Sequence, residues 1–166
     1  MSNTRLISII LCTFVIACAS SGVTPPQTQL QIREFQTRSY ETTDTLMVMK
    51  ALLNVLQDDQ FIVKNADKDL GLLTATKEVD VESGTEAFFS SLFAGSDARW
   101  KKNCIIECSG NVSEFGEKTR VRINFQMKTL NNKGELMDVK QIDDPVYYQD
   151  FFSKVSKGIF IEEEGI

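Results

Sequence analysis

Histidine is absent from the sequence, which removes the side chain that most often serves as a base in hydrolytic enzymes. There is also no Cys-x-x-Cys pair and no glycine-rich phosphate loop. A zinc site would have to combine two cysteines with carboxylates, which is an unusual ligand set. Acidic pairs occur at 58–59 and 143–144, but adjacent carboxylates at the ends of elements are usually helix caps or solvated turns. We therefore expect a protein that is not an enzyme and that holds no metal and no cofactor.

Basic residues are also fewer than acidic ones. The 166 residues include 18 lysines and arginines against 23 aspartates and glutamates, which gives a net charge of −5. A modestly acidic domain lacks the basic surface that nucleic-acid binding requires, so we expect no nucleic-acid partner. It has no broad attraction to anionic lipid either, so membrane residence would have to come from an anchor.

An uncharged, largely apolar run of 12 residues, 6–17, follows Arg5 near the N-terminus. As a helix it would span about 18 Å, which is too short to cross a bilayer core of about 30 Å. A short positive region followed by an apolar run of this length is typical of a secretory signal. Two other interpretations stay open: an ordinary cleaved signal and a short uncleaved anchor.

The end of this run, Val15, Ile16, Ala17 and Cys18, resembles the lipobox of bacterial lipoproteins. In such proteins the cysteine thiol receives a diacylglyceryl group, and the signal is removed in front of the modified cysteine. The resemblance implies a signal peptide over residues 1–17, cleavage between Ala17 and Cys18, and a lipid on Cys18. Ala19 is not the aspartate that retains Gram-negative lipoproteins in the inner membrane, which favours the outer membrane, facing the periplasm.

Residues 18–30 carry no charge and are rich in small residues and proline, so we expect a lipidated N-terminus and a flexible tether. Residues 31–166 are predicted to form one domain with a real core. Apolar and polar residues alternate from Val121 to Met127, which indicates an antiparallel sheet with one solvent-exposed face. A second helix is expected to begin at Pro145. The predicted strands cover 31–41, 61–63, 72–76, 103–113, 119–129 and 136–142, with a first helix over 45–57 and a hairpin turn over 65–71.

Cys104 and Cys108 lie in one predicted strand, four residues apart. Four strand steps separate their α-carbons by roughly 13 Å, about twice the distance that a disulfide permits. We therefore expect both cysteines to be reduced and to face the core.

These elements predict an α+β fold, a single antiparallel sheet packed against two helices in the order β-α-β-β-insertion-β-β-β-α. This order resembles the helix-grip domains of bacterial envelope lipoproteins, including an accessory lipoprotein of the β-barrel assembly machine. Segments 37–38, 48–51, 55–58, 61–63 and 71–77 are also similar to a recurrent lipoprotein family of uncharacterised function. That family usually has glycine where this chain has Gln60.

A long insertion of about residues 80–100 separates the two groups of strands, and its flanking glycines and serines predict a mobile segment. If it is helical, its apolar residues form one stripe that either closes one end of the core or contacts a partner protein or the membrane. The candidate contact residues are Phe88, Phe89, Leu92, Phe93 and Trp100.

The sequence thus favours a non-enzymatic lipoprotein of the cell envelope that binds or scaffolds an assembly. Its expected partners are the membrane, through the lipid anchor, and other envelope proteins. The alternative is a lipoprotein that binds a small hydrophobic ligand, such as a lipid, because helix-grip folds can open a cavity between sheet and helix.

Overall fold

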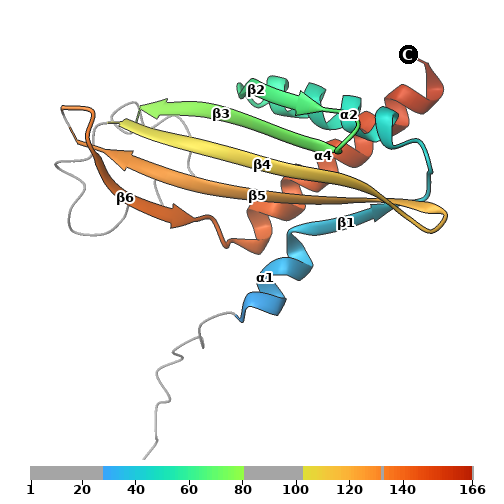
Figure 1. The fold of residues 1–166 in the computed structure, drawn as a ribbon, viewed down its shortest axis with the longest axis horizontal. Helices are drawn as coiled ribbons and strands as arrows, with labels where there is room; N and C mark the ends of the chain where they lie inside the picture. The colour runs from blue at the N-terminus through green and yellow to red at the C-terminus, as the bar shows by residue number, and fades with distance from the viewer. Residues whose placement is uncertain (1–27, 81–102, 132, 166) are drawn as a thin grey trace, which may run out of the picture.

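A computed structural model describes residues 28–80, 103–131 and 133–165 of the chain. Within these ranges one antiparallel sheet of six strands packs with three helices (Figure 1), so the predicted α+β class is confirmed. The elements are α1 (Gln29–Phe35), β1 (Thr37–Tyr40), α2 (Thr45–Asp58), β2 (Ile62–Asp67), β3 (Leu72–Asp80), β4 (Asn103–Phe115), β5 (Lys118–Leu130), β6 (Leu136–Gln141) and α4 (Pro145–Glu164).

The strand order across the sheet is β1-β5-β4-β3-β2, and β6 also pairs with β5. β4 and β5 pair along their whole length. β1 pairs with the first part of β5, from Thr119 to Arg122, and β6 pairs with its last part, from Gln126 to Leu130. The two short strands therefore lie one after the other along the same edge of β5.

α2 and α4 pack against each other on one face of the sheet and lie behind it in Figure 1. Side chains of β5 alternate as predicted, with the residues that face the helices buried and the others exposed or half-buried. The two helices approach closely at Gly158, where an added Cβ would lie 3.5 Å from Ala51 Cβ. The helix predicted to begin at Pro145 is confirmed as α4, and it buries one apolar stripe made of Tyr148, Phe151, Phe152, Val155 and Ile159.

The prediction of a strand over residues 31–41 is wrong for its first half. Residues Gln29–Phe35 form the helix α1, and the strand is restricted to Thr37–Tyr40. Thr28 and Gln31 form a reciprocal capping box that starts this helix, and residues 28–30, which we expected in the tether, belong to its first turn. Ile32 is buried, so the helix is held by the domain rather than by its own short length.

The end of α2 explains why glycine is unnecessary at position 60. Gln60 adopts φ 67°, the left-handed conformation that usually favours glycine after a helix. Its N–H donates to Gln57 O at 2.9 Å, and Phe61 N donates to Leu56 O at 2.8 Å. These bonds and the burial of Phe61 hold the reversal of the chain at some conformational cost.

Cys104 and Cys108 are both buried in the core, as predicted. Both face α2 and α4 from β4, because Cys104 pairs with Thr129 and Cys108 with Phe125 on the inner face of the sheet.

Candidate functional site at the free edge of the sheet

The edge of β5 between β1 and β6 is completed by backbone bonds and by one side chain, that of Tyr148. Ile123 N donates to Gln36 O at 2.9 Å, and Ile142 N donates to Phe125 O at 2.9 Å. The Tyr148 hydroxyl accepts from Phe125 N at 3.1 Å, donates to Ile142 O at 3.0 Å and accepts from Gln36 Nε2 at 3.2 Å. It therefore stands between an N–H and a C=O that would otherwise pair directly in an antiparallel ladder. This bonding fixes where β6 leaves the sheet and α4 begins.

Aromatic rings fill the space between this part of the sheet and α4. The Phe125 ring lies 5.0 Å from Tyr147, 5.1 Å from Phe151 and 5.6 Å from Tyr148, measured between ring centroids. Phe61 packs on the same ring at 5.8 Å. Ring pairs at these distances are close-packed and favourable. The described residues thus form a solid core where a helix-grip fold could otherwise open a ligand cavity.

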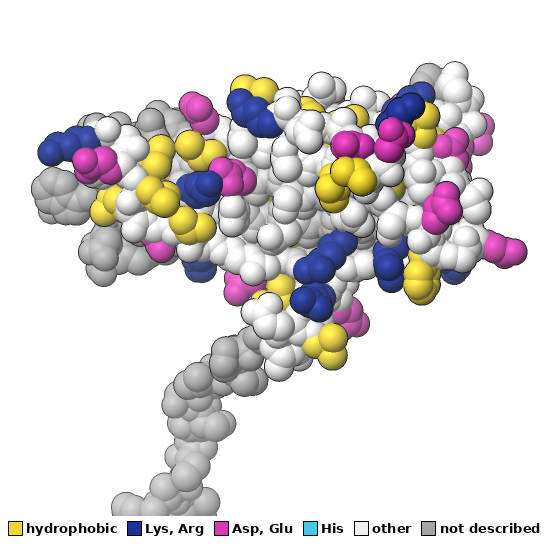
Figure 2. Space-filling view, in the orientation of Figure 1, with side chains coloured by type: hydrophobic (Ala, Val, Ile, Leu, Met, Phe, Trp, Pro, Cys, Tyr) yellow, Lys and Arg dark blue, Asp and Glu magenta, His cyan; other side chains and the backbone are white. Residues whose placement is uncertain are grey.

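β6 is the most exposed strand of the described sheet. All six of its side chains are exposed, and they include Leu136 at 56%, Met137 at 53% and Val139 at 47%. Figure 2 shows hydrophobic side chains gathered at the end of the molecule where Figure 1 places β6. Exposed apolar side chains that cluster on one surface are more typical of an interaction site than apolar residues scattered singly.

The backbone of β6 also has a free side. Hydrogen-bonded and non-hydrogen-bonded residue pairs alternate along an antiparallel ladder. Since Ile142 and Phe125 are a hydrogen-bonded pair, the next hydrogen-bonded pair is Lys140 with Met127. The N–H and C=O groups of Val139 and Gln141 then point away from β5. No described strand lies on that side, because the sheet order ends there. An unpaired edge of this kind is a template for another strand.

Charges of both signs surround the apolar side chains of β6. Asp138 and Lys140 are exposed, and neither forms an ion pair with a described residue. On the open face of the sheet, Lys128 Nζ lies 2.6 Å from Glu107 Oε1. The Lys128 ammonium, helped by a hydrogen bond from Gln126, lowers the pKa of the Glu107 carboxyl. The edge is therefore neither strongly acidic nor strongly basic, which suits a protein strand better than a charged polymer.

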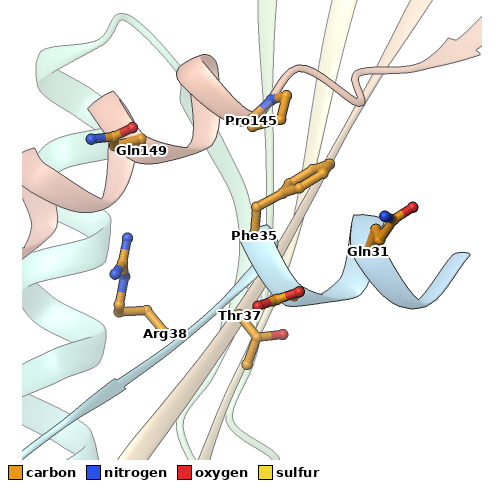
Figure 3. Close-up of a pocket in the computed structure, with 7 residues that line it drawn as sticks. Gln31, Phe35, Thr37, Arg38, Pro145 and Gln149 are labelled. Atoms are coloured by element: carbon orange, nitrogen blue, oxygen red, sulfur yellow. The ribbon is translucent and has the colours of Figure 1, made fainter. Parts of the chain in front are cut away.

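Two open grooves lie on the helical side of the molecule. One, of about 540 Å³, lies between α1, β1 and the start of α4, and Figure 3 shows Arg38 and Gln149 on one side of it and Gln31 on the other. The Arg38 guanidinium carbon also lies 5.5 Å from the centre of the Phe152 ring. The second groove, also of about 540 Å³, lies between the C-terminal halves of α2 and α4. Both grooves mix charged, polar and apolar side chains, and neither assembles a recognisable catalytic set.

The described ranges contain no group of three cysteine or acidic side chains that could hold a metal ion. Among the same residues, no helix combines the length and apolarity needed to cross a bilayer. The expected absence of a metal and of enzymatic activity stays a prediction.

The site residues predicted from the sequence lie outside the described residues. These are Ala17 and Cys18 at the cleavage site and Phe88, Phe89, Leu92, Phe93 and Trp100 in the insertion. Their roles stay predictions. The free edge of β6, in contrast, was not predicted, because residues 136–142 were expected only as one more strand of the sheet. The signal that could have found it was the apolar character of a short strand that carries charges on alternate residues.

Two buried side chains that can lose a proton, the Cys108 thiol and the Tyr40 phenol, predict a loss of stability at alkaline pH. Burial raises the pKa of the Cys108 thiol from 9.0 to about 12, and burial likewise raises the pKa of the Tyr40 phenol from 10.0 to about 12. The unfolded chain therefore releases these protons first, so the contribution of these two groups to stability is constant below about pH 8 and is lost as the pH rises from about 9 to 12. Each group contributes about 1.4 kcal/mol per pH unit in its interval.

Urea unfolding midpoints measured between pH 7 and pH 11 test this expectation. The Cys108→Ala variant is the control, since it should show a smaller decline between pH 9 and pH 10, where the thiol of the unfolded chain ionises first. Equal declines in the two proteins would contradict the assignment to Cys108.

No protein-family model matches the chain, and no curated protein sequence matches it. Among solved structures, it is similar to a TBP-like protein from Parabacteroides distasonis, with 13% sequence identity, a TM-score of 0.39, and coverage of 74% of this chain and 90% of that chain. It is also similar to a DUF4468 family protein from Bacteroides ovatus, with 10% identity, a TM-score of 0.40, and coverage of 81% and 89%. Likeness at this level assigns neither a family nor a function to the chain.

Proposed function

We propose that this chain is a lipid-anchored, non-enzymatic docking protein of the bacterial envelope, facing the periplasm from the outer membrane. Its docking surface is the free edge of β6. The observation that carries this proposal is the combination of an unpaired strand edge with exposed apolar side chains on that strand. Strand addition to such an edge supplies backbone hydrogen bonds, and the flanking side chains supply specificity.

The position of α1 supports the proposal, because it sets how far the domain can lie from its anchor. Thr28 caps α1 and lies ten positions (28 − 18) after Cys18 in the chain. A fully extended chain of that length spans at most about 35 Å. Since Ile32 fixes α1 to the domain, a lipid on Cys18 would keep the β6 edge close to the membrane surface.

The alternative function, binding of a small hydrophobic ligand, has weaker support. The rings around Phe125 fill the space in which a helix-grip protein would hold such a ligand. The two grooves are open and lined partly by charged residues such as Glu34, Arg38 and Lys157. Ligand pockets are more often concave and mainly apolar. The described surface therefore favours docking over ligand storage.

The anchor is tested by Cys18→Ser, which is expected to abolish lipid labelling and move the chain out of the washed membrane fraction. The matched control is Cys12→Ser, which changes a cysteine inside the predicted signal and should leave both properties unchanged. Fractionation and labelling with a radioactive fatty acid measure the two effects. If the Cys18→Ser protein stays in membranes washed with high salt and carbonate, the anchor is not what holds it there.

The docking edge is tested by Val139→Asp, which places a charge in the middle of β6 without touching the core. Complexes isolated from detergent-solubilised envelopes after chemical cross-linking should be lost in this variant. Leu46→Asp is the matched control, because Leu46 is similarly exposed, at 49%, but lies on α2. Equal recovery of complexes from both variants would contradict a docking role for β6.

A further inference from the structure

We infer that the strand which pairs with the free edge of β6 is β6 of a second copy of this chain, antiparallel to the first, around a two-fold axis at Val139. This inference rests on the proposed docking role of β6 and names its partner. A two-fold axis requires a surface that is complementary to itself, and the residues of β6 meet this requirement.

The backbone restricts the possible registers. The outward-facing groups belong to Val139 and Gln141, and they can form hydrogen-bonded pairs only with outward-facing groups of the other strand. A shift by one residue would bring outward-facing positions opposite Lys140, whose backbone is already paired with Met127 of β5. The allowed registers therefore differ from one another by two-residue steps.

Charge selects one of these registers. With Val139 opposite Val139 of the second copy, Asp138 lies opposite Lys140 of that copy, and the same ion pair forms again across the axis. If one strand is shifted by two residues in one direction, Asp138 lies opposite Asp138 of the second copy. If it is shifted by two residues in the other direction, Lys140 lies opposite Lys140 of the second copy. Opposite charges directly across an antiparallel pair are favourable, and like charges are unfavourable.

The selected register also uses the closest approach in the ladder. Asp138 and Lys140 of the second copy occupy a non-hydrogen-bonded pair, in which α-carbons lie about 4.5 Å apart and side chains meet. Both residues are exposed and free of ion pairs with described residues, so no existing interaction is lost. On the other face, the exposed Val139 side chains of the two copies would cover each other.

The straight part of the edge is short, so the pairing is weak in dilute solution. The register of β6 against β5 shifts between Thr129 and Leu130, which leaves Met137 as an extra residue and bends the strand there. About five residues per strand can pair. Confinement of two anchored copies to one membrane surface raises their effective concentration and compensates for the small contact.

Cysteine cross-linking in membranes tests the register. In the Val139→Cys chain the two new cysteines face each other across the axis, and α-carbons in a hydrogen-bonded pair lie about 5.5 Å apart, within the range for a disulfide. The matched control is Gln141→Cys, because Gln141 faces Met137 of the second copy and its own counterpart lies roughly 13 Å away. Mild oxidation should give a disulfide-linked dimer only for Val139→Cys. Cys104 and Cys108 are buried and should add little background.

Charge reversal tests the partner. Asp138→Lys and Lys140→Asp, each introduced into the Val139→Cys chain, should lower the cross-linked fraction by about tenfold, because each places like charges opposite each other twice. The double reversal, Asp138→Lys with Lys140→Asp, should restore it. Glu117→Lys makes the same charge change as Asp138→Lys in the exposed turn between β4 and β5, and should have no effect.

Three results would overturn the inference. Equal cross-linking of Val139→Cys and Gln141→Cys would exclude this register. If Val139→Cys gives no dimer while Val139→Asp still loses a different envelope protein, the docking role stands but its partner is not a second copy. If the thiol introduced by Val139→Cys is protected from a soluble thiol reagent in the monomer, another part of the same chain covers the edge, and both the inference and the docking role fail.

Discussion

Replacing Gly71 by alanine is expected to lower the free energy of unfolding by about 3–5 kcal/mol. Gly71 has φ 66°, and an added Cβ would overlap the backbone oxygen of Val112. Its own carbonyl oxygen accepts a 2.7 Å hydrogen bond from Val112 N. The turn after β2 is therefore held against β4 by backbone contacts, which cannot move aside as a flexible side chain can.

Gly116→Ala separates the effect of the clash from that of the backbone conformation. Gly116 has φ 64°, close to that of Gly71, but nothing lies within 4 Å of its Cβ position. Alanine at 116 should therefore cost only the strain of the left-handed conformation, about 1 kcal/mol. Urea unfolding followed by circular dichroism measures both variants. Similar losses at the two positions would mean that the contact with Val112 adds nothing.

Tyr148→Phe is expected to destabilise the fold by about 2–4 kcal/mol, although it removes a single oxygen atom. The substitution leaves the N–H of Phe125 and the C=O of Ile142 buried without their partner, and it deprives Gln36 Nε2 of an acceptor. Each buried group that loses its hydrogen bond costs about 1–3 kcal/mol. Since these groups join β5, β6 and α4, hydrogen exchange should also increase at the Phe125 amide.

Tyr40→Phe also removes a buried tyrosine hydroxyl, but this hydroxyl lacks the hydrogen bonds that Tyr148 makes. The Tyr40 hydroxyl is buried and has no partner in hydrogen-bond geometry among the described residues, although the Ser156 side chain lies nearby. Removing a buried hydroxyl of this kind should be neutral or stabilising by up to about 1 kcal/mol. Thermal unfolding of the two variants provides the comparison. Equal melting temperatures would show that the bonds of Tyr148 are not what holds the edge of the sheet.

Most of the secondary structure could be predicted because its signals are local. β5 and α4 each alternate or repeat with one clear period, so one face of each had to be buried. The helix α1 was missed although its capping box, Thr28 and Gln31, is visible in the sequence. Seven residues form a stable helix only when something packs against them, and here Phe35 packs on Tyr148, far away in the chain.

The candidate site was much harder to predict. The sequence shows that β6 is short and carries apolar residues. Its exposure, however, depends on which strands lie beside it. The proposed anchor is the reverse case: its pattern, ending at Cys18, is complete within a few residues and needs no fold.

The sequence by itself determined the α+β class, the sheet face that packs on the helices, the burial of Cys104 and Cys108, and the expectation of a lipid anchor. Each of these depends on periodicity or on a short contiguous pattern. The tertiary structure alone decided that β1 and β6 share the edge of β5, that the Tyr148 hydroxyl joins them, and that one side of β6 is left unpaired. Strand order and edge exposure depend on contacts between residues far apart in the chain, and no local pattern encodes them.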